Sequence, residues 1–193
     1  MNVVIIDYGA GNTKSVQFAL KRLGVEAVLT NNFDLILKAD KVIFPGVGHA
    51  SSAMEQIKRF GLEQLISTLK QPVLGVCLGM QLMCKFSEEG NTKGLGIFDL
   101  EVKKFGTENK IPQIGWNTIF DLKSELLSGL NENEFMYFVH SFYVPLAQET
   151  IATANYGLDY SAALQKNNFY GCQFHPEKSG DKGELILKNF LSI

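Results

Sequence analysis

The first half of the chain alternates short β-branched runs with amphipathic stretches, and this alternation is the feature that most constrains its fold. Strands are predicted at residues 3–6, 25–29, 42–44 and 73–76, and helices at residues 13–23 and 50–70. Such an order is typical of βαβ units, in which parallel strands form a sheet and helices cover its faces. The first half therefore predicts an α/β fold.

The second half is richer in strands. Six more are predicted at residues 100–105, 114–120, 135–140, 151–155, 161–165 and 169–174, before a last helix at 183–191. No repeat occurs, and no linker rich in Pro, Gly or Ser marks a boundary. We therefore expect one domain over residues 1–193, with a parallel or mixed central sheet flanked by helices and a strand-rich second half.

Composition narrows the classes of function. The chain has 193 residues, 46% hydrophobic and 20% charged, which suffices for one buried core. A formal charge of −2 gives no electrostatic reason to expect nucleic acid or an acidic membrane as a partner, which favours a small substrate. The first residues lack the pattern of a signal peptide or a membrane span, so a cytoplasmic protein is expected. Three cysteines without a CxxC pair argue against disulfides and a zinc site.

Cys77 lies where a predicted strand meets a helix-compatible stretch, within Gly75-Val76-Cys77-Leu78-Gly79. Strand, tight turn and helix form a nucleophile elbow, here with cysteine in place of serine, and the glycines avoid collisions across the strained turn. Backbone N–H groups at the start of the helix favour the thiolate. Most free cysteines are simply buried hydrophobes, and we predict that role for Cys84 and Cys172, which lack such glycines. Cys77 is the predicted nucleophile.

A cysteine nucleophile needs a base, and the chain has three histidines. His175 follows a predicted strand, and Glu177 stands two residues further on. An imidazole between Cys77 and Glu177 can take the thiol proton on one nitrogen while the carboxylate fixes its tautomer through the other. His140 lies in a predicted strand and is expected to be structural or binding, whereas His49 follows a glycine loop and is expected to be exposed. A Cys77–His175–Glu177 triad is therefore predicted.

The loop Pro45-Gly46-Val47-Gly48 follows another predicted strand. A Pro-Gly pair is often only a turn, but beside the Cys77 elbow it can direct a backbone N–H at the oxyanion of an acyl intermediate, with a second N–H from Leu78. The elbow, this loop and the loop at residues 8–12 should meet at the carboxyl ends of the parallel strands. The loop at 8–12 lacks the third glycine of a dinucleotide-binding motif and the lysine of a P-loop, so we do not predict nucleotide binding.

Seven segments together carry a resemblance to a known family. They are IIDYGAGN (5–12), PGVG (45–48), GVCLGMQL (75–82), GLGI (94–97), GWN (115–117), YFVHSFY (137–143) and QFHPEKSG (173–180). Over essentially its full length the chain resembles class I (triad) glutamine amidotransferases, and within them the glutaminase subunits of imidazole glycerol phosphate synthases. The resemblance implies the flavodoxin-like fold of that family in a single domain.

The resemblance also implies a reaction. The Cys77 thiolate would attack the side-chain amide of glutamine, and the backbone of Gly46, Val47 and Gly48 with the Leu78 N–H would hold the oxyanion. Protonated His175 would release ammonia, and water activated by His175 would then hydrolyse the thioester to glutamate. The implied contacts with the glutamine head group come from Gln81 and from the backbone of Ser141 and Phe142. No cofactor is expected.

A partner is implied as well. Ammonia is mostly protonated at neutral pH and is then a poor nucleophile, which favours delivery along a closed path. By resemblance, the partner is a (β/α)8-barrel cyclase that forms a heterodimer with this chain and stimulates its activity when its ligand is bound. Four residues match positions near that interface: Asn12, Trp116, Tyr137 and Lys178. Their residue types alone would also fit core aromatics and a solvated lysine.

One departure leaves an alternative open. Gln113 and Ile114 precede Gly115-Trp116-Asn117, where the resemblance leads us to expect His and Met. If this loop lies near the partner, the chain can instead be a paralogue that supplies ammonia for amidation of a surface sugar. The PGVG and HPEKSG segments disfavour a Cys-His protease or chaperone-like relative, and the complete triad disfavours a silent binding subunit.

Overall fold

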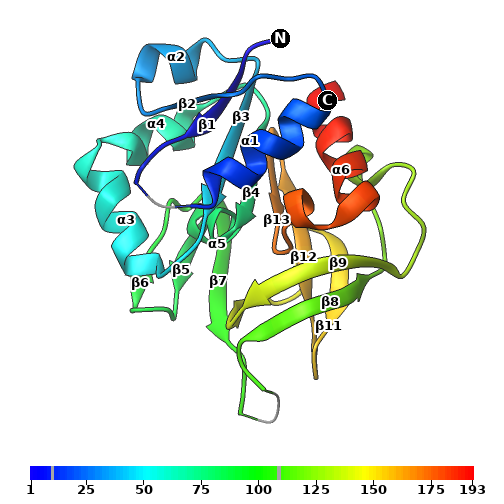
Figure 1. The fold of residues 1–193 in the computed structure, drawn as a ribbon. Helices are drawn as coiled ribbons and strands as arrows, with labels where there is room; N and C mark the ends of the chain where they lie inside the picture. Colours follow the sequence, from blue (N-terminus) through cyan, green and yellow to red (C-terminus); the bar gives the residue numbers. More distant parts are fainter. Residues whose placement is uncertain (10, 108–109) are drawn as a thin grey trace.

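A seven-stranded mixed sheet forms the centre of the molecule in the computed structural model, which describes residues 1–9, 11–107 and 110–193 (Figure 1). Its strands, in spatial order, are β11 (Thr150–Asn155), β12 (Asp159–Lys166), β13 (Phe169–Cys172), β4 (Val73–Cys77), β3 (Lys41–Gly46), β1 (Val3–Ile6) and β2 (Val28–Thr30). The strands from β13 to β2 pair in parallel, and β12 and β11 extend the sheet by antiparallel pairing. The predicted α/β fold with a mixed central sheet is confirmed.

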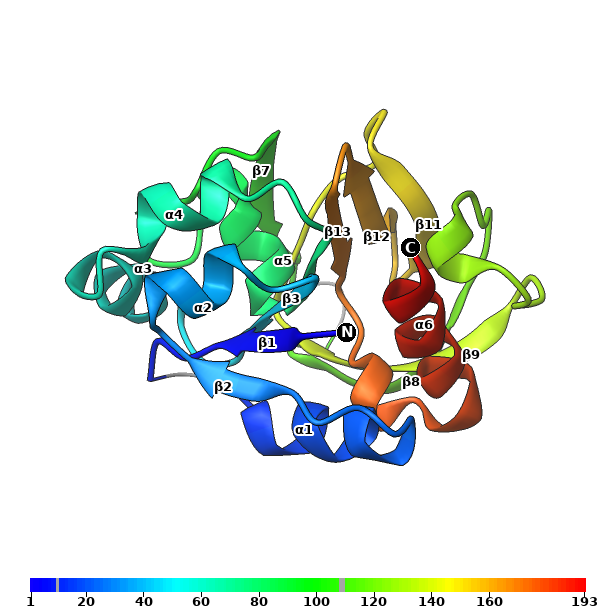
Figure 2. The same ribbon diagram turned by 90° about the horizontal axis from the view of Figure 1, so that it is seen from above.

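Helices cover both faces of this sheet, with α1 and α6 on one face and α3 and α4 on the other (Figure 2). The helices are α1 (Thr13–Arg22), α2 (Phe33–Leu37), α3 (Ala50–Arg59), α4 (Leu62–Thr68), α5 (Leu78–Met83) and α6 (Gly180–Ser192). Alternate side chains of β1 enter the two cores: Val3 and Ile5 face α1, whereas Val4 and Ile6 face the α3–α4 side. Strands buried on both faces explain the continuous apolar runs of the first half.

Two smaller sheets account for the strand-rich second half. One has the order β10-β7-β5-β6, and the other is the ribbon β8–β9. Their strands are β5 (Cys84–Ser87), β6 (Thr92–Lys93), β7 (Phe98–Lys104), β8 (Gln113–Ile119), β9 (Glu134–His140) and β10 (Phe142–Tyr143). Short 3-10 helices lie at Glu125–Leu127 and Pro176–Lys178.

The predicted helix at residues 50–70 is wrong as a single helix. Gly61 has a φ of +69°, a left-handed conformation that glycine adopts without strain, and it separates α3 from α4. The chain turns there, and both helices pack their apolar faces on the same core cluster. Besides the two 3-10 helices, four short elements were not predicted, namely α2, β5, β6 and β10, none of which exceeds five residues.

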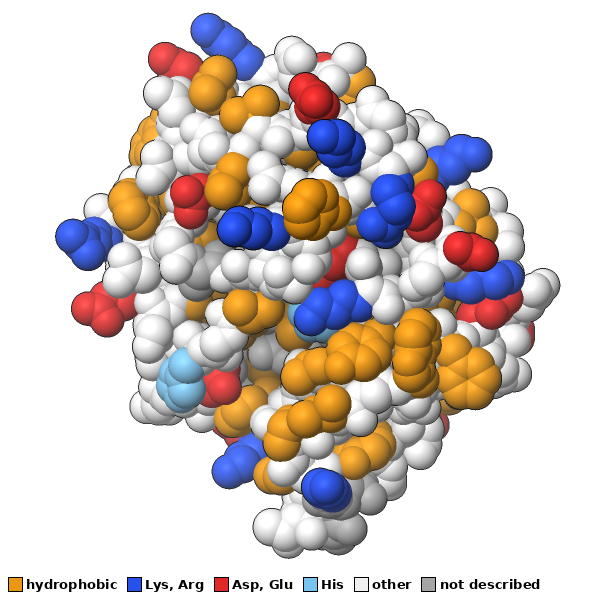
Figure 3. Space-filling model, in the orientation of Figure 1, with side chains coloured by type: hydrophobic (Ala, Val, Ile, Leu, Met, Phe, Trp, Pro, Cys, Tyr) orange, Lys and Arg blue, Asp and Glu red, His pale blue; other side chains and the backbone are white. Residues whose placement is uncertain are grey.

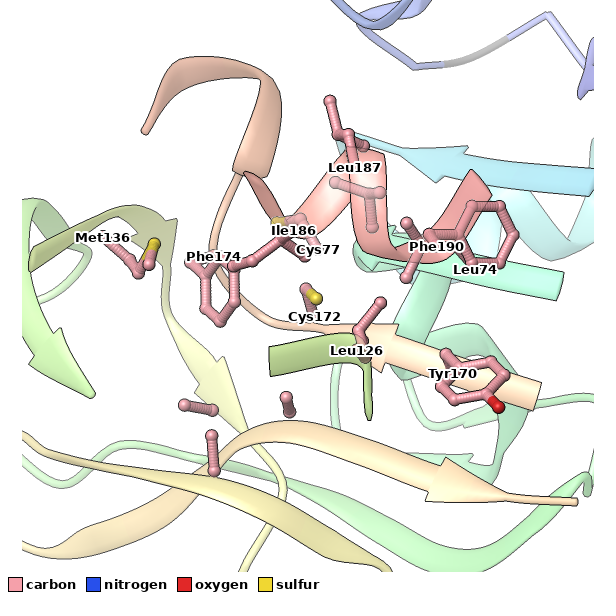
Figure 4. Packing of buried hydrophobic residues seen from close by; sticks show 14 of the residues in the cluster. Leu74, Cys77, Leu126, Met136, Tyr170, Cys172, Phe174, Ile186, Leu187 and Phe190 are labelled. Atoms are coloured by element: carbon pink, nitrogen blue, oxygen red, sulfur yellow. The ribbon is translucent and has the colours of Figure 1, made fainter. Parts of the chain in front are cut away.

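Cys77 lies at the edge of the hydrophobic core that α1 and α6 cover. Cys77, Cys172 of the adjoining strand and Ile186 of α6 belong to one buried cluster, part of which Figure 4 shows. Cys77 is only 6% exposed, so the surrounding side chains hold it firmly in place. It nevertheless lines a cavity at the rim of the sheet.

Candidate active site

Three strand ends and their loops meet at one rim of the central sheet, as predicted. Gly46, at the end of β3, pairs in register with Cys77 at the end of β4. The hydroxyl of Tyr8, in the loop after β1, donates a 2.7 Å hydrogen bond to the carbonyl of Pro45. Strand β13 lies on the other side of β4 and leads directly towards His175. Parallel strand order therefore places the three loops together.

Cys77 has the strained backbone of a nucleophile elbow, with φ 53° and ψ −111°. A non-glycine residue in such a conformation costs on the order of 1–3 kcal/mol, which the packed surroundings must offset. The flanking glycines are sterically required. A Cβ at Gly75 would collide with the Met80 backbone nitrogen and the Met83 side chain, and one at Gly79 would collide with the carbonyl oxygen of Phe44.

His175 and Glu177 form a buried pair beside Cys77. The Glu177 carboxylate oxygen Oε1 lies 2.8 Å from Nδ1 of His175, and the two side chains are only 4% and 1% exposed. Burial lowers the pKa of His175, but interactions with Cys77 and Glu177 outweigh it and raise the pKa to about 10. The second oxygen, Oε2, is buried with no hydrogen-bond partner among the described residues, so His175 is the principal partner of this carboxylate.

The raised pKa of His175 predicts a pH-dependent contribution to stability. Because the pKa is raised from 6.5 to about 10 in the folded state, the stabilisation is fully present below about pH 6.5 and is lost as the pH rises through 10. The difference in free energy of unfolding between the wild type and His175→Asn should therefore shrink between these pH values. Urea denaturation at each pH measures it, and a gap that stays constant would contradict the assignment.

A cavity of about 260 Å³ opens above Cys77. Nine residues singled out from the sequence line it: Val47, Gly48, Cys77, Leu78, Gln81, Ser141, Phe142, His175 and Lys178. Gly46 and Glu177 are outside the lining, because Gly46 packs against Leu78 and Gly79 and Glu177 lies against His175. The volume suits a small molecule rather than a folded polypeptide.

Four more residues line the cavity: Glu89, Pro112 and Val139, which sequence reasoning missed as site residues, and His140, for which a structural or binding role was expected. The half-buried Glu89 accepts a 2.8 Å hydrogen bond from the backbone N–H of Ala50 at the start of α3, and it supplies the acidic side chain of the described lining. It follows β5, a strand that was not predicted. A pair of consecutive acidic residues, Glu88 and Glu89, gave no signal of a ligand site.

His140, for which a structural or binding role was predicted, borders the cavity. Burial lowers its pKa to about 4, so the ring is neutral near pH 7, and Nδ1 lies 2.7 Å from the carbonyl of Phe142. Because a carbonyl only accepts, Nδ1 carries the proton. His49 is exposed, and Cys84 and Cys172 are buried, as predicted for each.

The ribbon β8–β9 exposes an apolar face next to the cavity, where orange side chains gather in Figure 3. Trp116 is 56% exposed and packs edge-on against Tyr137, with ring centroids 5.9 Å apart. The ammonium of Lys178 lies 5.8 Å from the centre of the Tyr137 ring. Asn12 lies at the same rim, immediately before α1.

The two unexpected residues of this ribbon face opposite ways. Gln113 is 3% exposed, and its Oε1 accepts a 3.0 Å hydrogen bond from the Tyr160 hydroxyl. Ile114 is 64% exposed on the apolar face that carries Trp116. Of these two residues, only Ile114 is exposed and able to contact a partner. Gln113, which stands where the resemblance led us to expect His, lies in the interior.

The described residues contain no group of three or more His, Cys, Asp or Glu side chains arranged to hold a metal ion. Within the same residues, no helix has the length and apolar character needed to cross a membrane.

The strained Cys77 elbow, the buried His175–Glu177 pair and the small cavity are the features of a thiol-dependent amidotransferase. Residues 4–193 match the family Glutamine amidotransferase class-I. The chain belongs to this family.

Two curated relatives narrow the comparison. The chain is 57% identical to the "Imidazole glycerol phosphate synthase subunit HisH" of Bacteroides fragilis strain YCH46, covering 100% of both chains. It is 46% identical to the protein of the same name from Haemophilus influenzae strain Rd, covering 99% of this chain and 97% of that one. A solved crystal structure of a glutamine amidotransferase matches with a TM-score of 0.78 at 18% identity, covering 99% of this chain and 98% of that one. This last likeness concerns the fold.

Proposed function

We propose that this chain is the glutaminase subunit of imidazole glycerol phosphate synthase, which hydrolyses glutamine and passes the ammonia to a cyclase subunit. The observation that carries the proposal is the Cys77 elbow beside the buried His175–Glu177 pair, at the base of a cavity of about 260 Å³. Relatives of that name at 57% and 46% identity over the full length support the choice of synthase. They do not favour the alternative of a paralogue that amidates a surface sugar.

In the proposed reaction, His175 holds the proton of the Cys77 thiol as an imidazolium, in keeping with its raised pKa, and the Cys77 thiolate attacks the side-chain amide carbon of glutamine. The N–H groups of Gly48 and Leu78 stabilise the oxyanion, since both residues line the cavity beside the sulfur. The imidazolium protonates the departing amine, and ammonia leaves a glutamyl thioester. Water then gives a proton to His175 and hydrolyses the thioester, while Glu177 fixes the imidazole throughout.

Glutamine recognition is assigned to the polar part of the cavity lining. The side chain of Gln81 is 4% exposed, and the backbone around Ser141 and Phe142 borders the same space. Glu89 adds a carboxylate, the group that best pairs with the α-ammonium of an amino acid. The cavity thus offers polar groups for both ends of glutamine.

Glu89→Gln tests this assignment. The variant keeps an oxygen that can accept from the Ala50 N–H but removes the charge, so we expect the KM for glutamine to rise about tenfold with kcat little changed. Glu88→Gln is the matched control, because the neighbouring Glu88 is exposed and pairs with Lys103 outside the cavity. Equal KM values in wild type and Glu89→Gln would remove Glu89 from substrate binding.

The proposed partner is a (β/α)8-barrel cyclase docked on the apolar face of β8–β9, with Asn12, Trp116, Tyr137 and Lys178 at the contact. Strand β9 connects this face with the reacting groups. The backbone carbonyl of Tyr137 accepts a 2.9 Å bond from the His175 N–H, and the carbonyl of Val139 lies 3.7 Å from the Cys77 sulfur. A shift of β9 on docking therefore acts on both the base and the nucleophile.

Lys178→Ala is expected to weaken stimulation by the partner severalfold and to change the free energy of unfolding by less than about 0.5 kcal/mol. The physical reason is the loss of an ammonium that lies over Tyr137 and lines the cavity. Lys188→Ala, an exposed lysine of α6, serves as the control. Glutaminase rates with and without the cyclase measure the effect, and stimulation equal to wild type would contradict it.

Labelling by the glutamine analogue 6-diazo-5-oxonorleucine tests the proposed function itself. Mass spectrometry should find one adduct on Cys77 in the wild type and none in Cys77→Ala. A protein that cleaves peptides but does not react with the analogue would instead be a protease. We also place the enzyme in the cytoplasm, where the reducing conditions suit its three free cysteines.

A further inference from the structure

Gln173 contacts the nucleophile, a role that neither the motif nor the comparisons assign to it. Its side chain is 0% exposed, and its amide nitrogen Nε2 lies 3.8 Å from the sulfur of Cys77. Its backbone N–H donates a 2.8 Å bond to the carbonyl of Ala162 in β12, which fixes the residue at the edge of the central sheet.

The orientation of the Gln173 amide follows from a neighbouring carbonyl. Gln81 places one amide atom 3.0 Å from the backbone carbonyl of Phe142 and, with the same atom, 2.8 Å from the Gln173 amide. Because the Phe142 carbonyl can only accept, that atom of Gln81 must be the nitrogen. Gln173 must then present its oxygen to Gln81, which leaves its nitrogen to donate to the Cys77 sulfur. The side-chain amides of Gln81 and Gln173 thus form a chain of hydrogen bonds from the Phe142 carbonyl to the Cys77 sulfur, and this chain fixes the orientation of both amides.

The donor matters because one of the other groups at the sulfur, the carbonyl of Val139, disfavours charge, whereas His175 favours it. The Cys77 thiol has the carbonyl of Val139 at 3.7 Å, an acceptor that stabilises the neutral thiol and repels a thiolate. The effect of the helix start that the sequence led us to expect is limited, since α5 has only six residues. A buried N–H donor at the sulfur therefore has a substantial effect, since hydrogen bonds to charged groups are stronger than those between neutral groups.

We propose that Gln173 is a positioning residue, which orients the Cys77 sulfur and favours its thiolate, and that Gln81 keeps the Gln173 amide in the donating orientation. This inference deepens the proposed function, on which it rests. It also gives Gln81 a second role: its amide nitrogen is engaged by Phe142 and Gln173, and its oxygen is the end available to a ligand in the cavity.

Alkylation of Cys77 in the full chain by iodoacetamide, followed over a range of pH by mass spectrometry of the Cys77 peptide, tests the inference. In Gln173→Leu and Gln173→Glu, the pH of half-maximal alkylation rate should rise by about one unit, and the rate at neutral pH should fall about tenfold. Gln173→Leu is the sharper variant, because it removes the donor without adding a charge, whereas the carboxylate of Gln173→Glu still accepts from Gln81 but also repels the thiolate. Gln165→Glu in β12 makes the same chemical change where the side chain accepts from Ser124, and should react as the wild type does.

Superimposable pH profiles for the wild type and the Gln173 variants would overturn the inference. If neither Gln173 variant folds, Gln81→Leu tests the same link, because it frees the Gln173 amide. The inference then predicts that the pH of half-maximal alkylation rate is higher in Gln81→Leu than in the wild type, and an unchanged pH overturns it. Alkylation requires neither glutamine nor a partner, so its result is independent of the diazo-analogue labelling, whose failure would count against the proposed function.

Discussion

Cys77→Ser is expected to lower glutamine hydrolysis by about 10⁴-fold or more while leaving binding to the proposed cyclase partner largely intact. The sulfur occupies a strained elbow and faces both His175 and the cavity, and Cys77 supplies the thiol of the described lining. Serine has nearly the same size, but its hydroxyl remains protonated and is a weaker nucleophile. The measurement is steady-state glutamate release in the complex, with binding measured by calorimetry.

Cys84→Ala is the control for this substitution. Cys84 is also buried and free, but it follows α5 and does not line the cavity, so the variant should retain its activity. Turnover by Cys77→Ser within tenfold of the wild type would remove Cys77 from the role of nucleophile.

Glu177→Gln should lower kcat by about 10³–10⁴-fold with little change in the KM for glutamine. The amide has nearly the same shape as the carboxylate, but it removes the charge that holds the proton on Nδ1 of His175 at 2.8 Å. The second carboxylate oxygen of Glu177, Oε2, has no hydrogen-bond partner among the described residues. The substitution therefore affects chiefly the interaction of Glu177 with His175. Glu177 is outside the cavity lining, which is why substrate binding should be spared.

Steady-state kinetics of the complex measure both constants. Glu184→Gln in α6 is a suitable control, since Glu184 pairs with Arg22 at the surface. A kcat within about threefold of the wild type would show that Glu177 does not orient the base.

Much of the fold follows from local pattern. The apolar runs in β1, β3, β4 and β13 and the period of α1 and α6 are strong because these elements are buried on defined faces. Elements of two to five residues escaped prediction, since α2, β5, β6 and β10 are too short for a period to emerge. The break at Gly61 was missed because both α3 and α4 place apolar residues on one core, which mimics a single helix.

The residues of the candidate site also fall into two groups, those that local sequence predicts and those that it does not. Cys77, His175 and Glu177 are adjacent to recognisable turns, so local sequence was enough to predict them as a triad. Glu89 carries no such signal, and Gln173 belongs to the QFHPEKSG segment but has no turn that marks its role. The placement of the two side chains depends on contacts with Ala50 and Cys77, 39 and 96 residues away in sequence. The inward direction of Gln113 likewise depends on its partner Tyr160 in β12. Tertiary contacts of this kind are set by the packing of whole sheets.

Glutamine hydrolysis by the purified chain is the most direct test, measured alone, with the cyclase subunit, and with the cyclase plus its phosphoribulosyl formimino aminoimidazole carboxamide ribotide. We predict a low rate for the chain alone and a strong increase when cyclase and ribotide are both present. A preparation that reacts fully with 6-diazo-5-oxonorleucine but shows no increase would contradict the assignment to imidazole glycerol phosphate synthase.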